Sequence, residues 1–168
     1  ERFQTEVSLR RAENKYRSIF ENAVEGIFQT TTAGRYTTVN PMLAKIYGYD
    51  SPAELIDSVT NIEQQLYVDQ DQRRIFVELM HRDGAVIGFE SAIYRKDGSI
   101  IWISESARTI RDRAGRVTGF EGTVEDVTAR KLTELELHRR DRLLEGVAQV
   151  CQQLLTNLNL ESSIPSVL

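Results

Sequence analysis

Residues 94–131 read YRKDGSIIWISESARTIRDRAGRVTGFEGTVEDVTARK, and this stretch decides the fold class of the chain. Near its beginning, Asp97-Gly98 separates two runs rich in β-branched and aromatic residues, at residues 86–95 and 100–110. Asp-Gly between two such runs is a strong signal for a tight turn, because both positions tolerate a positive backbone φ. The stretch therefore predicts an antiparallel hairpin.

Two Ala-Gly pairs predict further turns of the same kind. Ala114-Gly115 separates the second strand from a third at residues 117–126. Earlier in the chain, Ala33-Gly34 separates two shorter runs, at residues 26–31 and 36–39. Since strands joined by tight turns pair with each other, the sequence predicts five antiparallel strands, two early and three late.

The residues between these two groups of strands, 40–84, carry the signals of helices. Asn40-Pro41 combines a helix N-cap with proline at the first helical position. Ser51 and Glu54 have capping-box spacing, and a third helix is expected between Asp69 and Gly84. A hairpin, a group of helices and a three-stranded meander predict an α+β domain with the helices on one face of the sheet.

Amphipathic helices are expected on both sides of this middle region. Apolar residues recur every three or four positions near the N-terminal end, which predicts a lead helix over residues 1–22. A second helix is expected over residues 129–160, with polar residues 138–142 interrupting its apolar pattern. It is predicted to form an interrupted coiled coil, because heptad-like spacing holds only at Leu143, Val147, Val150 and Leu154.

Composition excludes several classes of protein. The 25 acidic and 21 basic residues leave a net charge of −4, whereas binding to nucleic acid or an anionic membrane needs clustered basic residues. The longest apolar run is only four residues, 100–103, so neither a membrane span nor a signal peptide is expected. Cys151 is the only cysteine in the sequence and cannot form an internal disulfide, which favours the cytoplasm.

The ordered set of these elements resembles the PAS family. Residues 94–131 are similar to its last three strands, and Asp126-Val127-Thr128 matches its closing signature of Asp, Ile or Val, and Thr. Upstream, ENKYRSIFENAVEGIF and VNPMLAKIYGYDSPAEL resemble its opening helix, first strands and first short helices. The resemblance covers about residues 12–130 and implies the strand order 2-1-5-4-3, with a role in sensing or dimerisation.

The C-terminal segment RRDRLLEGVAQVCQQLLTNLNLESSIPSVL resembles the first helix of a GAF domain. We therefore divide the chain into a lead helix (1–22), a PAS core (23–128) and a signalling helix (129–160) that runs into a truncated GAF domain ending at residue 168. The first residue is Glu1 rather than Met, so we expect a piece of a multidomain signalling protein. The domains that usually accompany PAS modules in one chain imply a downstream GAF domain and an effector such as a two-component histidine kinase or a nucleotide cyclase.

Catalysis and metal binding are not expected within this segment. The sequence has only two histidines, His81 and His138, and no pattern that would place one of them beside a nucleophile and an acid. Clusters with metal-ligand spacing and glycine-rich phosphate loops are also missing from the sequence. We predict that the segment is not an enzyme and has no metal site.

Flavin photochemistry is excluded on the residues that the resemblance compares. Photoreceptors of the family carry a reactive cysteine in the middle helices and polar amides at three inward strand positions. Those positions correspond here to Ile93, Ile103 and Val124, and residues 1–150 contain no cysteine. A flavin edge would therefore face hydrocarbon and leave its hydrogen bonds unmade.

Haem binding stays open as an alternative through His81. Haem-binding relatives use a histidine on or after the third helix, and His81 stands at the end of that helix. The competing interpretation is an exposed histidine in the last turn, where a cation suits the helix dipole. Of the two interpretations, we prefer the exposed histidine and expect the segment to bind no cofactor.

Strand and helix alternation predicts which side chains point into the interior. Most of them are apolar, which fits either a filled core or a pocket for a small apolar ligand. Gln29 and Glu105 are the polar members, and a buried polar group needs a partner. The pocket candidates are Gln29, Val39, Leu43, Ile46, Ile75, Leu79, Phe89, Ser91, Ile93, Ile103, Glu105 and Val124.

The opposite face of the sheet is predicted to carry large aromatic side chains. Phe28, Tyr94 and Trp102 alternate out of phase with the expected core. Such side chains need a cover, either the lead helix of the same chain or a second subunit. The family resemblance and the C-terminal helix both favour a homodimer, so we expect one. A dimerisation spacer that binds no ligand is a further alternative.

Asp126 and Thr128 are predicted to form the joint between the sheet and the C-terminal helix. Thr128 is suited to cap that helix by accepting from its first free N–H groups. The family resemblance implies an ion pair between Asp126 and a basic residue of the preceding hairpin, here Arg95 or Lys96. The joint is either a signalling element or a plain helix cap.

Overall fold

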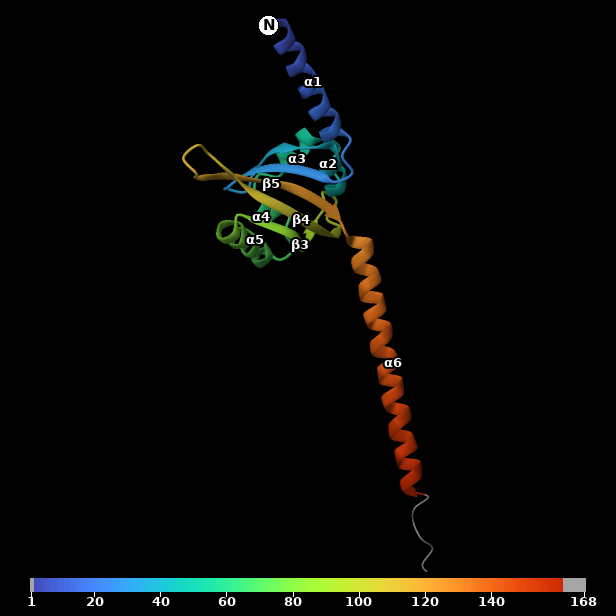
Figure 1. Cartoon of the computed structure of the whole chain (residues 1–168). Helices are drawn as coiled ribbons and strands as arrows, with labels where there is room; N and C mark the ends of the chain where they lie inside the picture. Colours follow the sequence, from blue (N-terminus) through green and yellow to red (C-terminus); the bar gives the residue numbers. More distant parts are fainter. Residues whose placement is uncertain (1, 162–168) are drawn as a thin grey trace, which may run out of the picture. The chain divides into compact units, whose positions relative to one another are not determined.

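The computed structural model describes residues 2–161, with side chains for residues 7–154. The chain divides into two units, the first running to Thr128 and the second starting at Ala129. Figure 1 shows the elements in chain order: α1 (Arg2–Glu21), β1 (Gly26–Thr31), β2 (Tyr36–Val39), α2 (Pro41–Tyr47), α3 (Pro52–Ser58), α4 (Ile62–Gln65), α5 (Gln70–Asp83), β3 (Ala85–Tyr94), β4 (Ile100–Arg111), β5 (Val117–Asp126) and α6 (Thr128–Glu161).

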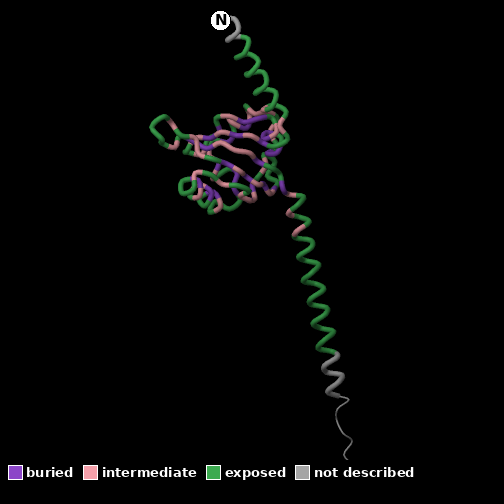
Figure 2. Tube along the Cα trace, in the orientation of Figure 1, coloured by how far each residue is buried: buried purple, intermediate pink, exposed green. Residues whose placement is uncertain are grey.

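The five strands form one antiparallel sheet in the order β2-β1-β5-β4-β3. This order confirms the expected α+β fold class. Strand β5 comes last in the chain but lies in the centre, between β1 and β4. Helix α2 packs on β1, α3 on β2 and α5 on β3, and the core lies between these helices and the sheet. Figure 2 shows the buried residues concentrated in this part of the chain.

The helix boundaries follow the capping signals of the sequence. The side chains of Asn40, Ser51 and Asp69 each accept a backbone N–H at the start of α2, α3 and α5. Helix α2 ends at Gly48, whose φ of 80° lies in the left-handed region that side chains with a Cβ rarely adopt. Three local signals thus set where the core helices begin.

Asn40 also links three elements through a fully buried amide group. Its Oδ1 accepts from the N–H groups of Ile27 (2.8 Å) and Leu43 (2.9 Å). Its Nδ2 donates to the carbonyl groups of Phe20 (3.2 Å) and Glu25 (3.0 Å). Because the amide has all four partners, its burial leaves no polar atom unsatisfied. The end of α1, the start of β1 and the start of α2 are therefore held together.

Strand β1 has the opposite phase from the one predicted. Phe28 was predicted to lie outside, but it is 4% exposed and packs edge-on against Tyr36, with ring centroids 6.2 Å apart. Gln29 was predicted to point inward, but it lies on the outer face and bonds Thr38 and Glu121. The register with β5, which pairs Phe28 with Gly122, brings the Phe28 side of the strand under the helices. Burial of phenylalanine rather than glutamine is the favoured outcome.

Helix α5 is rotated relative to the prediction. Ile75 was expected in the pocket but is 43% exposed, and Leu79 is only half-buried. The buried face instead carries Arg73, Phe76 and Met80. These three recur at helical spacing, so the buried stripe includes a charged residue that hydrophobic periodicity alone did not place inside.

Helix α6 is 34 residues long, and from Ala129 onward it belongs to the second unit. Its apolar residues in the heptad-like positions are each more than half exposed: Leu143, Val147, Val150 and Leu154. No helix within residues 2–161 is long and apolar enough to cross a membrane. The last part of the segment that resembles a GAF domain lies outside the described residues, so the GAF assignment stays a prediction.

Replacing Ile103 with Ala should destabilise the fold by about 2–5 kcal/mol, because Ile103 is fully buried and the change leaves a cavity. Urea unfolding of the two proteins measures the difference. Ile87, which is 90% exposed on the neighbouring strand, is the matched control, and Ile87→Ala should change stability by less than about 0.5 kcal/mol. Equal effects of the two substitutions would show that β4 does not face the core as described.

Candidate functional site

The centre of the core contains a group of buried polar side chains, which we call the polar core cluster: Tyr36, Tyr47, Tyr67, Arg73 and Glu105. They come from five different places, namely β2, α2, the segment between α4 and α5, α5 and β4. Only Glu105 was among the predicted pocket residues. The fold therefore assembles the cluster from residues that are distant in sequence.

Tyr67 is the central member of the cluster. Its hydroxyl group donates to Oε2 of Glu105 and also interacts with the guanidinium group of Arg73. The guanidinium carbon of Arg73 lies 5.7 Å from the ring centroid of Tyr67 and 5.0 Å from that of Phe76. These distances are those of cation–π contacts. Among the described residues, no carboxylate lies within 4.0 Å of the Arg73 guanidinium.

Burial dominates the electrostatics of the cluster. It raises the pKa of Glu105, while the charge of Arg73 and the hydrogen bond from Tyr67 act in the opposite direction. Burial and the nearby Glu105 carboxyl group likewise raise the pKa of Tyr36, Tyr47 and Tyr67. The three tyrosines are therefore neutral hydrogen-bonding groups at physiological pH.

The other pocket candidates fall into two groups. Phe89 is half-buried and packs edge-on against Phe76 at 5.5 Å, and the remaining buried candidates are Val39, Leu43, Ile46, Ser91, Ile93, Ile103 and Val124. Gln29, Ile75 and Leu79 do not join them. Within the described residues, the hydroxyl groups of Ser91 and Thr30 are buried and have no hydrogen-bond partner. Such orphaned atoms mark places where the interior accepts another polar group.

Sequence reasoning missed four of the five cluster residues for a physical reason. Tyrosine and arginine both have an apolar body and a polar end, so neither enters a simple apolar stripe. One usable signal was present, since Arg73 stands three residues before Phe76 and seven before Met80. That spacing places it on the buried face of α5 once Phe76 and Met80 are recognised as core.

His81 lies in the last turn of α5 and is exposed. Its ring centroid is 6.1 Å from that of Phe120, in an edge-on arrangement. Haem ligation by His81 stays a prediction. Among the described side chains, no group of three His, Cys, Asp or Glu residues is arranged to hold a metal ion.

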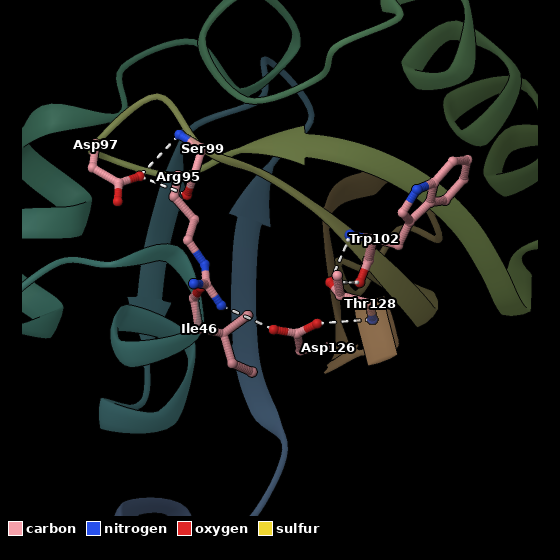
Figure 3. Close-up of polar contacts among 7 residues, drawn as sticks. All are labelled: Ile46, Arg95, Asp97, Ser99, Trp102, Asp126 and Thr128. Atoms are coloured by element: carbon pink, nitrogen blue, oxygen red, sulfur yellow. Dashed lines mark hydrogen bonds and ion pairs between the residues drawn. The ribbon is translucent and has the colours of Figure 1, made fainter. Parts of the chain in front are cut away.

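Figure 3 shows the joint at the end of β5. Nη2 of Arg95 donates to Oδ2 of Asp126 (2.9 Å), and Nε of the same side chain donates to the carbonyl oxygen of Ile46 (2.9 Å). Oδ1 of Asp126 accepts the backbone N–H of Thr128 (3.0 Å). Arg95 and Asp126 therefore connect the end of α2 to the first residue of α6.

The expected ion pair of Asp126 is made by Arg95, one of the two basic residues named for it, whereas the role of Thr128 differs from the expectation. The Thr128 hydroxyl accepts from the backbone N–H of Trp102 (3.0 Å), so it bonds β4 instead of the first N–H groups of the helix. Lys96 does not pair with Asp126, because its Nζ lies 2.5 Å from a carboxylate oxygen of Glu54 and 3.4 Å from one of Asp50. The side chain of Arg95 extends toward Ile46 and Asp126, whereas that of Lys96 extends toward the start of α3.

The outer face of the sheet carries Tyr94 and Trp102 as expected from their phase, opposite Ile100 and Ala92 on the paired strands. Tyr94 is exposed and Trp102 is half-buried. A separate groove of about 550 Å³ is lined by residues of β1, β5, β4 and the start of β3, and Tyr16 and Phe20 of α1 contribute to its lining. Neither Tyr94 nor Trp102 lines this groove.

Comparison with known families gives one match that covers most of the chain. The family model described as the PAS fold matches residues 14–127. This range includes all five strands, the core helices and the first two residues of the Asp126-Val127-Thr128 joint.

Three relatives of known name are histidine or sporulation kinases. The chain is 27% identical over 165 residues to the methanogenesis regulatory histidine kinase FilI of Methanothrix harundinacea, and 25% identical over 149 residues to the sensor histidine kinase TmoS of Ectopseudomonas mendocina. It is 29% identical over 147 residues to sporulation kinase C of Bacillus subtilis. These matches cover 95%, 87% and 87% of this chain, but the chain spans only 18%, 15% and 33% of these relatives.

Solved structures show the same fold. The PAS domain of a protein from Colwellia psychrerythraea has a TM-score of 0.60 at 23% identity, covering 70% of this chain and 98% of that one. The PAS domain of an HTR-like protein from Haloarcula marismortui has a TM-score of 0.59 at 19% identity, covering 73% and 98%. At these identities the likeness concerns the fold alone.

The stability of the protein should depend on pH through Glu105. Because burial raises its pKa in the folded state above the ordinary value of 4.5, the folded state binds more protons than the unfolded state between these two values. The free energy of unfolding of the natural protein, relative to that of Glu105→Gln, should therefore fall as pH rises above 4.5 through the raised pKa. Urea unfolding between about pH 5 and pH 8 measures this difference.

Glu121 on the outer face is the matched control for this measurement. Its hydrogen bonds with Gln29 and Arg108 lower its pKa, so its contribution is lost only as pH falls below 4.5. The difference between the natural protein and Glu121→Gln should stay constant above about pH 5. A constant difference for Glu105→Gln as well would show that the Glu105 carboxyl group is not enclosed.

Proposed function

The chain belongs to the PAS fold family, and we propose that it is the sensory module of a multidomain signal-transduction protein in the cytoplasm. In this proposal a change in the core alters the joint at Asp126 and Thr128, and α6 carries the change to an effector. The observation that carries the proposal is the double engagement of Arg95, which binds both α2 and the end of β5.

The first step of the relay connects the polar core cluster to the end of α2. Tyr47 places its side chain in the cluster, and its own carbonyl oxygen accepts the backbone N–H of Lys96 (3.0 Å). The preceding residue, Ile46, offers its carbonyl oxygen to Arg95. A shift of α2 that follows a change in the cluster therefore acts on two adjacent residues of the β3–β4 turn.

The second step connects this turn to the joint. Arg95 and Asp126 are each about one-third exposed, at 33% and 31% of the side chain, so their ion pair adds roughly 0–1 kcal/mol of stability. Its role is geometric, because Asp126 also holds the first N–H of α6 at Thr128. Thr128 is in turn bonded to Trp102 of β4. The pair can therefore change the joint without unfolding the domain.

The effector is proposed to be a histidine kinase domain outside this segment. The named relatives are two histidine kinases and a sporulation kinase, and in each of them the matching part is a third of the length or less. Catalysis then belongs to the remainder of the protein, and this chain supplies the input. A GAF domain after α6 stays a prediction from the sequence.

We further propose that two copies of the chain associate through α6. The exposed apolar residues of its second half recur at spacings of four, three and four, which is the pattern of a two-stranded coiled coil. These residues are Leu143, Val147, Val150 and Leu154. A second copy offers the same stripe and covers it symmetrically.

Asp126→Asn and Thr128→Ala should each change the kinase output of the full-length protein without unfolding the PAS domain. The reason is that Asp126→Asn removes the charge that pairs with Arg95, while Thr128→Ala removes the hydroxyl group that accepts from Trp102, and each interaction contributes little to stability. Autophosphorylation and circular dichroism are the measurements, and Glu125→Gln, an exposed acidic neighbour on β5, is the control. Unchanged basal and stimulated output in both joint variants would reduce the motif to a structural turn.

The chain should be a dimer in solution, and Val147→Asp or Val150→Asp should shift it toward the monomer, because a carboxylate in the seam is buried without a partner. Light scattering at tens of micromolar measures the mass. Gln149→Asp, which changes a residue between the two, is the control and should leave the dimer intact. A monomeric mass for the unmodified chain would contradict dimerisation through this segment.

A further inference from the structure

A groove of about 340 Å³ lies between the β1–β2 turn, the start of α4 and α5. This volume is in the range of small-molecule sites. Two of the walls are joined at Gly34, whose carbonyl oxygen accepts the backbone N–H of Ile62 (3.1 Å), and the side chain of Asn61 caps α4 within its own wall. The groove therefore lies between tethered elements, with defined polar groups along it.

Arg73 is the one buried residue among those that line this groove. It is 5% exposed, and on its inner side it interacts with the Tyr67 hydroxyl group and with the rings of Tyr67 and Phe76. Burying a guanidinium group is costly unless an anion compensates it. The carboxyl group of Glu105 acts on the charge of Arg73, but it is not within ion-pair distance and is already bonded by Tyr67.

The neighbouring Arg74 lines the same groove but differs in each of these respects. It is largely exposed, and its guanidinium group pairs with Asp71 on the same helix. Arg73 is therefore the cation of the groove that can still take a carboxylate, which a guanidinium group binds with two parallel hydrogen bonds.

Two carboxylates, those of Glu63 and Glu78, also line the groove. The two carboxylates repel a ligand that carries only a negative charge, and Arg73 repels a ligand that carries only a positive charge. A ligand that carries both charges satisfies all three groups. We propose that the groove binds a small amino acid-like zwitterion, with its carboxylate at Arg73 and its ammonium group toward Glu63 and Glu78.

This inference rests on the proposed sensory function and names the class of ligand that starts the signal. A carboxylate at Arg73 competes with Glu105 for the positive charge of the cluster. Tyr67 and Glu105 then rearrange inside the core, next to Tyr47 of α2. The groove thus gives a solute from outside the domain access to the polar core cluster without opening the apolar core.

Isothermal titration of the 168-residue chain with three sets of probes tests the site. The first set contains glycine, β-alanine and 4-aminobutyrate, which separate the two charges by increasing lengths. Acetate, propionate and butyrate lack the ammonium group, and methylammonium, ethylammonium and propylammonium lack the carboxylate. At least one zwitterion should bind about tenfold more tightly than its two matched single-charge probes.

Arg73→Gln should weaken binding of that zwitterion by about tenfold or more, and Arg74→Gln should leave it within about twofold. If Arg73→Gln does not fold, the double variant Glu63→Gln, Glu78→Gln replaces it in the test. This variant should bind the simple carboxylate more tightly relative to the zwitterion than the natural chain does. Saturation by no zwitterion up to about 10 mM would overturn the inference. Equal binding of the simple carboxylates, or equal losses in the Arg73 and Arg74 variants, would overturn it as well.

These outcomes are independent of the relay through the joint. The kinase output of the Asp126 and Thr128 variants is measured without any of the probes. If the chain binds no zwitterion but the joint variants change kinase output, only the proposed ligand class is contradicted. If the chain binds the zwitterion but the joint variants do not change kinase output, the ligand site is supported and the proposed relay is contradicted.

Discussion

The guanidinium group of Arg73 and the carboxyl group of Glu105 share a core that is otherwise largely apolar, and neither is tolerated there without compensation. Tyr67 supplies part of it, because its hydroxyl group donates to Glu105 while its ring and hydroxyl group contact Arg73. This arrangement requires α5 to turn Arg73 inward and the α4–α5 segment to lie beside β3. The isolated bridge between Tyr67 and Ile93 holds that segment in place. The rotation of α5 and the exposure of Ile75 both follow.

Helix α2 extends the same constraint to the edge of the domain. It approaches β1 closely because Gly26 has no side chain, and a Cβ there would lie 2.6 Å from Cδ1 of Leu43. In this position Tyr47 reaches the polar core cluster, while the carbonyl oxygen of Ile46 is held by Arg95. Helix α2 therefore both contributes Tyr47 to the polar core cluster and is bonded to the joint through Arg95. In the proposed mechanism, sensing and relay would share this one helix of seven residues.

The outer face of the sheet and α6 have a different character. Glu121 accepts from Gln29 there at 3.0 Å and pairs with Arg108 at 2.7 Å, so these polar groups are satisfied at the surface. The apolar residues of the second half of α6 have no cover within the described chain. The outer face of the sheet is thus organised by polar bonds, whereas the second half of α6 exposes a stripe of apolar residues.

Much of the fold and part of the site could be predicted from local sequence. Turn residues and helix caps act over a few positions, so the boundaries at Asn40, Gly48 and Asp97-Gly98 and the core position of Ile103 were readable. The phase of β1 and of α5 was not, because both segments carry apolar residues on two faces. Only the pairing of β1 with β5 and the burial of Arg73 with Tyr67 decided between those faces. Such contacts join residues far apart in the chain, and local periodicity holds no information about them.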